Sequence, residues 1–199
     1  MSDIHPIYSK MITRAEREEK LRQHAKVIWL FGLSGSGKST LTTALERRLF
    51  ADGYVTTLLD GDNLRDGLNQ GLGFSDADRE ENIRRVAEVS KLFLQSGVIC
   101  LNSFITPRES LRTLARGIIG AENLLEIYVE CSFETCLKRD VKGLYRQAQA
   151  GKVANFTGQA SPFEPPSNPH LTLNTESTPL EQSLESLYSF VLGHLKVIG

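Results

Sequence analysis

Short apolar runs alternate with amphipathic segments along most of the chain. The apolar runs lie at residues 27–31, 54–59, 97–101, 125–129 and, more weakly, 170–173. Helical spacing of apolar positions predicts helices over about residues 38–51, 79–96, 107–117, 132–139 and 178–196. This alternation predicts an α/β fold, in which a mostly parallel five-stranded sheet carries helices on both faces.

Local chemistry marks the ends of two predicted helices. Gly97 follows an apolar helical stripe, at the place where a C-terminal cap belongs. Thr178 precedes Pro179, and a Glu follows three residues after the Thr, which predicts an N-cap at Thr178 and Pro179 in the first turn. The apolar stripe of this last helix comprises Leu180, Leu184, Leu187, Val191 and Leu195.

Two segments depart from the alternation. Residues 13–24 are polar and helix-favouring with a thin apolar face, which predicts an exposed helix or an arm that packs on a partner. Residues 141–169 are rich in Gly, Pro, Gln and Asn, and loops of this length in compact domains are usually functional or disordered. We therefore predict an N-terminal arm over residues 1–25 and one domain over residues 26–199, with a mobile lid at about 141–169.

Charge and composition argue against several classes of protein. The chain has 23 Lys and Arg against 24 Asp and Glu, so it presents no net basic field for nucleic acid. No apolar run approaches the length of a membrane span, and the N-terminus lacks the layout of a signal peptide. Three cysteines without metal spacing, two of them in apolar runs at Cys100 and Cys131, fit a reducing cytoplasm.

The first apolar run leads into a glycine loop and then a helix. Residues 32–40, GLSGSGKST, fit the pattern G-x-x-x-x-G-K-[ST] at every fixed position. Backbone N–H groups of such a loop wrap a phosphate chain, the Lys reaches the β- and γ-phosphates, and the Ser hydroxyl is placed for Mg²⁺. Because both flanks are correct, we favour a nucleoside triphosphate site over a chance turn. Its predicted residues are Gly32, Ser34, Gly35, Ser36, Gly37, Lys38, Ser39 and Thr40.

Two carboxylates, Asp60 and Asp62, follow the second predicted strand. Ligands of open α/β sheets bind outside the carboxyl ends of the strands, so this Asp-Gly-Asp-Asn sequence is expected near the glycine loop. Phosphoryl transfer needs one residue to organise Mg²⁺ and another to orient or deprotonate the acceptor hydroxyl. The third apolar run carries no carboxylate, so the usual Walker B acid is missing and Asp60 and Asp62 are the candidates. A turn without chemistry is the alternative.

An aromatic side chain, Phe74, stands in a polar, glycine-flanked stretch. Arg79 and Asn82 lie three residues apart at a helix start and face the same way. A second aromatic residue, Phe156, lies in the predicted lid. Two aromatic rings with an Arg and an Asn nearby suit a nucleotide-like ligand, whereas the alternative for Phe74 is a place in the core.

These features together resemble the adenylylsulfate kinase (APS kinase) family. The matching segments are residues 32–40, 59–65 (LDGDNLR), 72–75 (LGFS), 81–89 (ENIRRVAEV), 142–145 (KGLY), 155–158 (NFTG) and 161–164 (SPFE). The resemblance runs from about Thr13 to Thr175. Many NTPases share the P-loop, but this set of segments in this order is far more specific. It implies a P-loop NTPase-type three-layer sandwich, a P-loop kinase domain over residues 26–199.

The resemblance also implies an activity. ATP would donate its γ-phosphate to the ribose 3′-hydroxyl of adenosine 5′-phosphosulfate (APS), giving 3′-phosphoadenosine 5′-phosphosulfate (PAPS) and ADP in sulfate activation. Ser39 would ligate Mg²⁺, Asp60 would orient its waters, and Asp62 would position the 3′-hydroxyl. The implied protein is a cytoplasmic homodimer with a functional link to an ATP sulfurylase, and with neither nucleic acid nor membrane as a partner.

Further roles carry over residue by residue from the resemblance. Phe74 and Phe156 would sandwich the acceptor adenine, and Lys142 would come in with the lid to offset charge on the transferring phosphoryl group. Arg139 would lie against the donor adenine, or it is an ordinary helix-end arginine. The implied catalytic residues are Lys38, Asp60, Asp62 and Lys142. The implied substrate-binding residues are Asp62, Arg65, Phe74, Arg79, Asn82, Ile105, Lys142, Leu144 and Phe156.

One segment departs from the family pattern. The family commonly has Ile-Ser-Pro, an aromatic residue and Arg after the third strand, whereas this chain has Ile105-Thr106-Pro107-Arg108. Some members can carry phosphate on that Ser, and we expect no such role for Thr106. Direct in-line transfer needs no covalent intermediate, so the implied activity is unaffected.

Two other functions remain open at this point. The chain could be another small-molecule P-loop kinase, acting on a sugar, nucleoside or antibiotic hydroxyl, although the paired Phe residues and the lid favour a nucleotide acceptor. It could instead be a non-catalytic nucleotide-binding regulator, although such a module has no need for Asp62. The charge balance disfavours an RNA-binding NTPase.

Overall fold

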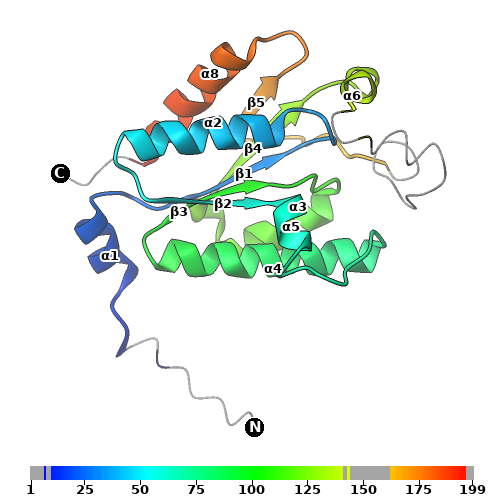
Figure 1. Cartoon of the computed structure of the whole chain (residues 1–199). Coiled ribbons are helices and arrows are strands. Elements are labelled where there is room, and N and C mark those ends of the chain that lie inside the picture. Colours follow the sequence, from blue (N-terminus) through cyan, green and yellow to red (C-terminus); the bar gives the residue numbers. More distant parts are fainter. Residues whose placement is uncertain (1–6, 8–9, 141–142, 144–161, 196–199) are drawn as a thin grey trace.

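A single parallel sheet organises the protein in the computed structural model, which describes residues 7, 10–140, 143 and 162–195. Its strands are β1 (Val27–Phe31), β2 (Thr56–Asp60), β3 (Ile99–Ser103), β4 (Leu124–Glu130) and β5 (Leu171–Asn174). They lie in the order β2-β3-β1-β4-β5, and every neighbouring pair is parallel (Figure 1). The predicted α/β class and all five predicted strands are therefore confirmed, although β2 and β3 begin two residues later than predicted.

Helices cover both faces of the sheet, as predicted (Figure 1). On one face α2 and α8 pack over Ile28 and Leu30 of β1, and on the other α4 and α5 pack over Trp29 and Phe31. Neighbouring residues of β1 thus point to opposite faces, and both faces are apolar because both are buried. The helices are α1 (Arg14–Leu21), α2 (Lys38–Ala51), α3 (Gly61–Arg65), α4 (Asp76–Gln95), α5 (Glu109–Ile119), the 3-10 turn η2 (Ala121–Asn123), α6 (Phe133–Arg139) and α8 (Leu180–Leu192).

The two predicted helix ends have different outcomes. Gly97 directly follows the C-cap of α4 with a φ of 77°, which confirms the predicted glycine cap. The predicted N-cap at Thr178 is wrong, because Pro179 is the N-cap of α8 and no side chain caps this helix. Asn174 Oδ1 accepts instead from the N–H groups of two following residues and forms a turn ahead of the helix. Leu180 at the helix start is 47% exposed, so the buried stripe begins later than predicted.

The three cysteines are buried and free, as expected for Cys100 and Cys131. Burial raises the pKa of the Cys100 thiol to about 12. Burial and the neighbouring Cys131 raise the pKa of Cys136 to about 12. The thiols of Cys100 and Cys136 are therefore protonated packing groups at neutral pH. Within the described residues, no helix combines the length and apolar character needed to cross a membrane.

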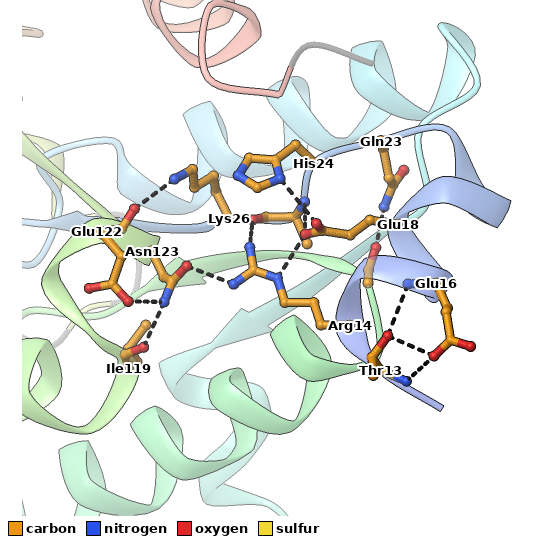
Figure 2. Close-up of polar contacts among 12 residues, drawn as sticks. Thr13, Arg14, Glu16, Glu18, Gln23, His24, Lys26, Ile119, Glu122 and Asn123 are labelled. Atoms are coloured by element: carbon orange, nitrogen blue, oxygen red, sulfur yellow. Dashed lines mark hydrogen bonds and ion pairs between the residues drawn. The ribbon is translucent and has the colours of Figure 1, made fainter. Parts of the chain in front are cut away.

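The N-terminal helix α1 packs on the domain through the face that includes Glu18. The prediction of an exposed helix is therefore wrong for this face. Polar contacts replace the missing apolar ones (Figure 2). Arg14 donates to Glu18 Oε1, Asn123 Oδ1 and the Ala25 carbonyl, each at 2.7 Å. Gln23 is 2% exposed and donates to the Gly97 carbonyl at 2.7 Å. The division of the chain at residue 25 stays a prediction.

Glu18 is the centre of this docking contact. Its carboxylate accepts from Arg14 Nε, from the Ala25 N–H at 2.8 Å and from His24 Nδ1 at 3.1 Å (Figure 2). Burial raises the pKa of Glu18, but the hydrogen bonds from Arg14 and Ala25 outweigh burial and hold the pKa below its usual 4.5. A carboxylate whose pKa is lowered by folding stabilises the fold above its unfolded pKa, and this contribution is lost as the pH falls.

We therefore expect Glu18→Gln to lower the free energy of unfolding by about 2 kcal/mol at pH 7, because it leaves buried donors poorly paired. At roughly 2–4 °C per kcal/mol, the melting temperature should fall by about 4–8 °C. The difference from the wild-type protein should shrink as the pH falls below about 4.5, because Glu18 then binds a proton in the unfolded chain before it does so in the folded protein. Thermal melts at pH 7 and pH 4 measure both effects. Glu19→Gln, at an exposed neighbour, is the control, and equal melting temperatures for the two variants would contradict the prediction.

Candidate active site

A cavity of about 700 Å³ lies at the carboxyl ends of the strands, where β1 meets α2 and β2 meets α3. Most residues predicted from the sequence line this one cavity. They are Ser34, Gly35, Gly37, Lys38, Ser39, Thr40, Asp60, Asp62, Arg65, Phe74, Arg79, Asn82, Ile105 and Arg139. Three predicted residues, Lys142, Leu144 and Phe156, lie outside the described residues. Gly32 and Ser36 are not part of the cavity wall.

The glycine loop has the backbone geometry that its sequence predicts. Gly35 and Gly37 have φ values of 77° and 97°, where other residues are strained. A Cβ at Gly32 would lie 2.4 Å from the Val129 carbonyl oxygen, so this residue allows the loop to pass close to β4. Lys38 Nζ donates to the Leu33 carbonyl at 2.7 Å, across the loop. The loop is therefore preshaped, with its lysine at the cavity wall.

The carboxylates after β2 meet the P-loop serine. Ser39 Oγ donates to Asp60 Oδ2 at 2.7 Å and lies 3.2 Å from Ser103 Oγ at the end of β3. Asp60 also caps α3, since its Oδ1 accepts from the Asp62 N–H at 3.0 Å. This places Asp62 in the first turn of α3, on the wall of the same cavity. The predicted proximity of the Asp-Gly-Asp-Asn sequence to the glycine loop is thus confirmed.

Ser103 is a cavity residue that the sequence did not single out. It pairs in register with Asp60 on the neighbouring strand, so it occupies the strand end from which an acid is missing. Its neighbour Asn102 is fully buried and donates to Ser90 Oγ of α4 at 2.8 Å, away from the P-loop serine. Ser103 could have been identified only from the position of β3 beside β2, and the sequence alone does not give the order of the strands.

The side of the cavity formed by α3 and α4 presents an aromatic ring and arginines. Phe74 is 45% exposed, so the core alternative for this residue is wrong. The Arg65 guanidinium lies 4.2 Å from the centre of the Phe74 ring, and Arg79 Nε donates to the Phe74 carbonyl at 3.1 Å. Burial lowers the pKa of Arg79, and repulsion from Arg65 and Arg108 adds to burial against the pull of Asp76. A partly desolvated cation among like charges favours an anionic ligand.

Two further polar residues support the site without having been predicted. Asn69 is 1% exposed, and its Nδ2 donates to Asn82 Oδ1 at 2.8 Å, which fixes the Asn82 side chain. Thr175 Oγ1 donates to the Ser36 carbonyl of the glycine loop at 2.8 Å. Arg139, in the last turn of α6, donates to the Thr175 carbonyl at 2.7 Å and therefore lies against this loop. These contacts join segments far apart in sequence, so no local pattern indicated them.

Comparison with known proteins identifies the family. A family model described as adenylylsulphate kinase matches residues 24–174, about three quarters of the chain. The chain belongs to the adenylylsulphate kinase family. The adenylyl-sulfate kinase of Bacteroides thetaiotaomicron is 52% identical over 189 residues, which are 95% of this chain and 94% of that protein.

Solved structures agree with this assignment. The APS kinase CysC of Mycobacterium tuberculosis, in complex with AMPPNP and APS, is 39% identical with a TM-score of 0.80, and the match covers 84% of this chain and 98% of that one. A gluconokinase from Sinorhizobium meliloti shares the fold at 17% identity and a TM-score of 0.58, over 85% of this chain and 93% of that one. The fold is thus common to small-molecule kinases, while sequence identity separates the adenylylsulphate kinases.

Proposed function

We propose that this chain transfers the γ-phosphate of ATP to the ribose 3′-hydroxyl of adenosine 5′-phosphosulfate, giving PAPS and ADP. One observation carries the proposal: the glycine loop and the Phe74–arginine wall open on the same cavity, which also holds Asp62. Such a cavity suits two nucleotides that react with each other. The family to which the chain belongs and the two ligands of the mycobacterial relative support the same pair of substrates.

On the donor side, the backbone N–H groups of residues 35–40 and Lys38 would hold the phosphates of ATP. Mg²⁺ prefers oxygen ligands and keeps several waters, so the Ser39–Asp60 oxygen pair fits it. Because Mg²⁺ is usually bound by one or two protein oxygens together with waters and substrate phosphates, the phosphates of ATP would complete the coordination. When bound, Mg²⁺ would supply positive charge that offsets the negative charge of the phosphates. Arg139 would lie beside the donor nucleotide.

On the acceptor side, Phe74 would stack on the adenine, and Arg65 and Arg79 would hold the phosphosulfate with Asn82. Asp62 would orient the 3′-hydroxyl and take its proton as the phosphoryl group arrives. The roles of Lys142, Leu144 and Phe156 stay predictions, since these residues lie outside the described part of the chain. The anionic phosphosulfate would then lie against the guanidinium of Arg79. Because this guanidinium is partly desolvated, its site favours an anionic ligand.

The test of this function is an acceptor assay. The pure protein should form a 3′-phosphorylated product from ATP and APS, detected by chromatography with mass spectrometry, and chelation of Mg²⁺ should abolish it. A panel of sugars and nucleosides separates this activity from that of another small-molecule kinase. Product with a sugar or nucleoside but not with APS would overturn the proposal, and ATP binding without any product would favour a regulator.

Phe74→Ala should raise the KM for APS about five- to a hundred-fold and change the KM for ATP little. The reason is that stacking of a base on an aromatic ring is worth about 1–3 kcal/mol. Steady-state kinetics with each substrate varied in turn measures the effect. Phe50→Ala, at a residue 73% exposed at the end of α2, is the matched control. An unchanged KM for APS in Phe74→Ala would remove the ring from the acceptor site.

The proposed partners follow from the family rather than from the cavity: we propose a cytoplasmic homodimer that works together with an ATP sulfurylase. Three apolar side chains near α1, those of Ile7, Met11 and Ile12, are 49–62% exposed, which fits an arm that packs on a second copy. Light scattering measures the mass in solution, and a monomer at all concentrations would contradict the dimer.

A further inference from the structure

The loop after β3 contains a residue in an uncommon backbone conformation. Thr106 has a φ of 41°, in the left-handed region that β-branched residues rarely adopt. It is only 2% exposed, yet it lines the cavity together with Ile105 and Pro107. Strained residues of this kind persist where their surroundings hold them in place, and they cluster at functional sites.

Two side chains, one from β1 and one from α5, hold Thr106 in place. Trp29 Nε1, from β1, donates to Thr106 Oγ1 at 2.9 Å. Arg112 Nη1, from α5, donates to the Thr106 carbonyl at 3.1 Å. The Arg112 side chain is 2% exposed and also donates to Glu109 Oε2 at 2.9 Å and to the Glu164 carbonyl at 3.0 Å. The hydroxyl and the carbonyl of the strained residue therefore each accept a hydrogen bond from a buried donor.

The same loop is attached to both sides of the active site. The Gly32 N–H, where the glycine loop begins, donates to the Ile105 carbonyl at 3.2 Å. Phe104 packs on Trp29, with ring centres 5.6 Å apart, and faces Gly61 between the two candidate carboxylates. Arg108 pairs with Asp76 of α4 at 2.9 Å. A shift of this loop would therefore move the side of the cavity formed by α3 and α4, where Phe74 and Arg79 lie, relative to the glycine loop.

We propose that Trp29, Thr106 and Arg112 are positioning residues for phosphoryl transfer. Their hydrogen bonds hold the left-handed turn at Thr106, and this turn places Ile105 and Pro107 on the cavity wall. The Thr106 hydroxyl is thus a buried structural acceptor for Trp29 and carries no phosphate during turnover. The kinetic consequence rests on the proposed function, whereas the hydrogen bond between Trp29 and Thr106 does not.

Kinetics of four variants test the positioning role. Thr106→Val keeps the branched shape and removes the acceptor oxygen, and Trp29→Phe keeps an aromatic ring and removes the donor. Each should lower kcat/KM for APS about tenfold while the KM for ATP stays within about twofold, because each leaves a buried polar group unpaired or the turn unsupported. The double variant should lose little more than either single variant, since both remove one interaction. Thr106→Ser, which retains the hydroxyl, should recover most of the loss.

A control and a direct readout make the test independent of folding defects and of the activity. Thr113→Val makes the same chemical change at an exposed position of α5 and should leave the kinetics unchanged. Trp29 is the only tryptophan of the chain, so intrinsic fluorescence reports on its indole alone. Loss of the hydrogen bond in Thr106→Val should shift the emission to shorter wavelength, whereas Thr113→Val should not.

Each outcome decides a separate point. Unchanged emission in Thr106→Val would overturn the hydrogen bond between Trp29 and Thr106. Shifted emission with wild-type kinetics for APS, or additive losses in the double variant, would overturn the positioning role. A phosphorylated peptide containing Thr106, found by mass spectrometry after turnover, would overturn its structural assignment. If the wild-type protein forms no PAPS, the proposed function fails, and the fluorescence still decides the contact.

Discussion

Asp62→Asn should lower the turnover number for APS phosphorylation about a hundred-fold and leave the affinity for ATP nearly unchanged. Asp62 lies in the first turn of α3, close to Asp60, which caps this helix, and it lines the same cavity as the glycine loop. An amide has the same shape and can still contact a hydroxyl, but it cannot take the proton that leaves during transfer. The loss should therefore fall on kcat.

Steady-state kinetics together with calorimetric titration of an ATP analogue separates the two quantities. Asp66→Asn removes a carboxylate from an exposed position directly after α3 and is the matched control, since it does not line the cavity. Wild-type turnover in Asp62→Asn would remove the carboxylate from the mechanism. A large loss of ATP affinity would instead place Asp62 on the donor side.

Lys38→Met should lower kcat/KM for ATP about a hundred- to a thousand-fold, the cost typical of removing one preorganised donor from a transition state. The Lys38 side chain is almost buried, with 7% exposed, and its ammonium group lies within the glycine loop, 2.7 Å from the Leu33 carbonyl oxygen. Charge that develops on the transferring phosphoryl group would meet this cation in a place where water screens it poorly. Methionine fills a similar volume without the charge.

Kinetics with ATP varied at saturating APS measures this loss, and a thermal melt shows whether the loop has kept its fold. Lys91→Met, at an exposed position of α4, is the matched control. A folded Lys38→Met protein with wild-type kcat/KM for ATP would contradict the role of the lysine. Loss of stability without loss of activity would show that its contact with Leu33 is mainly structural.

Features that depend on neighbours in the sequence could be predicted well. The helix over residues 38–51 and the strand over 27–31 have the same bounds in the structure, because apolar spacing and the glycine loop define them locally. The placement of Asp60 near Ser39 could also be predicted, since ligands of parallel sheets gather at the carboxyl ends of strands. The predicted N-cap at Thr178 was wrong because a turn around Asn174 precedes the helix, which takes Pro179, a residue without a side-chain acceptor, as its N-cap.

The site was predicted more completely than its supports. Phe74 directly precedes the N-cap of α4, and Arg79 and Asn82 lie in the first two turns of this helix, so a local pattern could reveal them. Ser103 and Asn69 were missed because their roles depend on a neighbouring strand and on a side chain of another segment. The docking of α1 was missed for the same reason, since its thin apolar face gave no sign of the polar contacts that hold it.

By itself, the sequence determined the fold class, the phosphate loop and the family, because periodicity and short motifs act within a few turns of chain. Only the tertiary structure decided which polar groups meet across the fold. Arg14 binds Asn123 over 109 residues, Gln23 binds Gly97 over 74, and Trp29 binds Thr106 over 77. Each such hydrogen bond is short-ranged and directional, so it forms only after packing has brought its partners together.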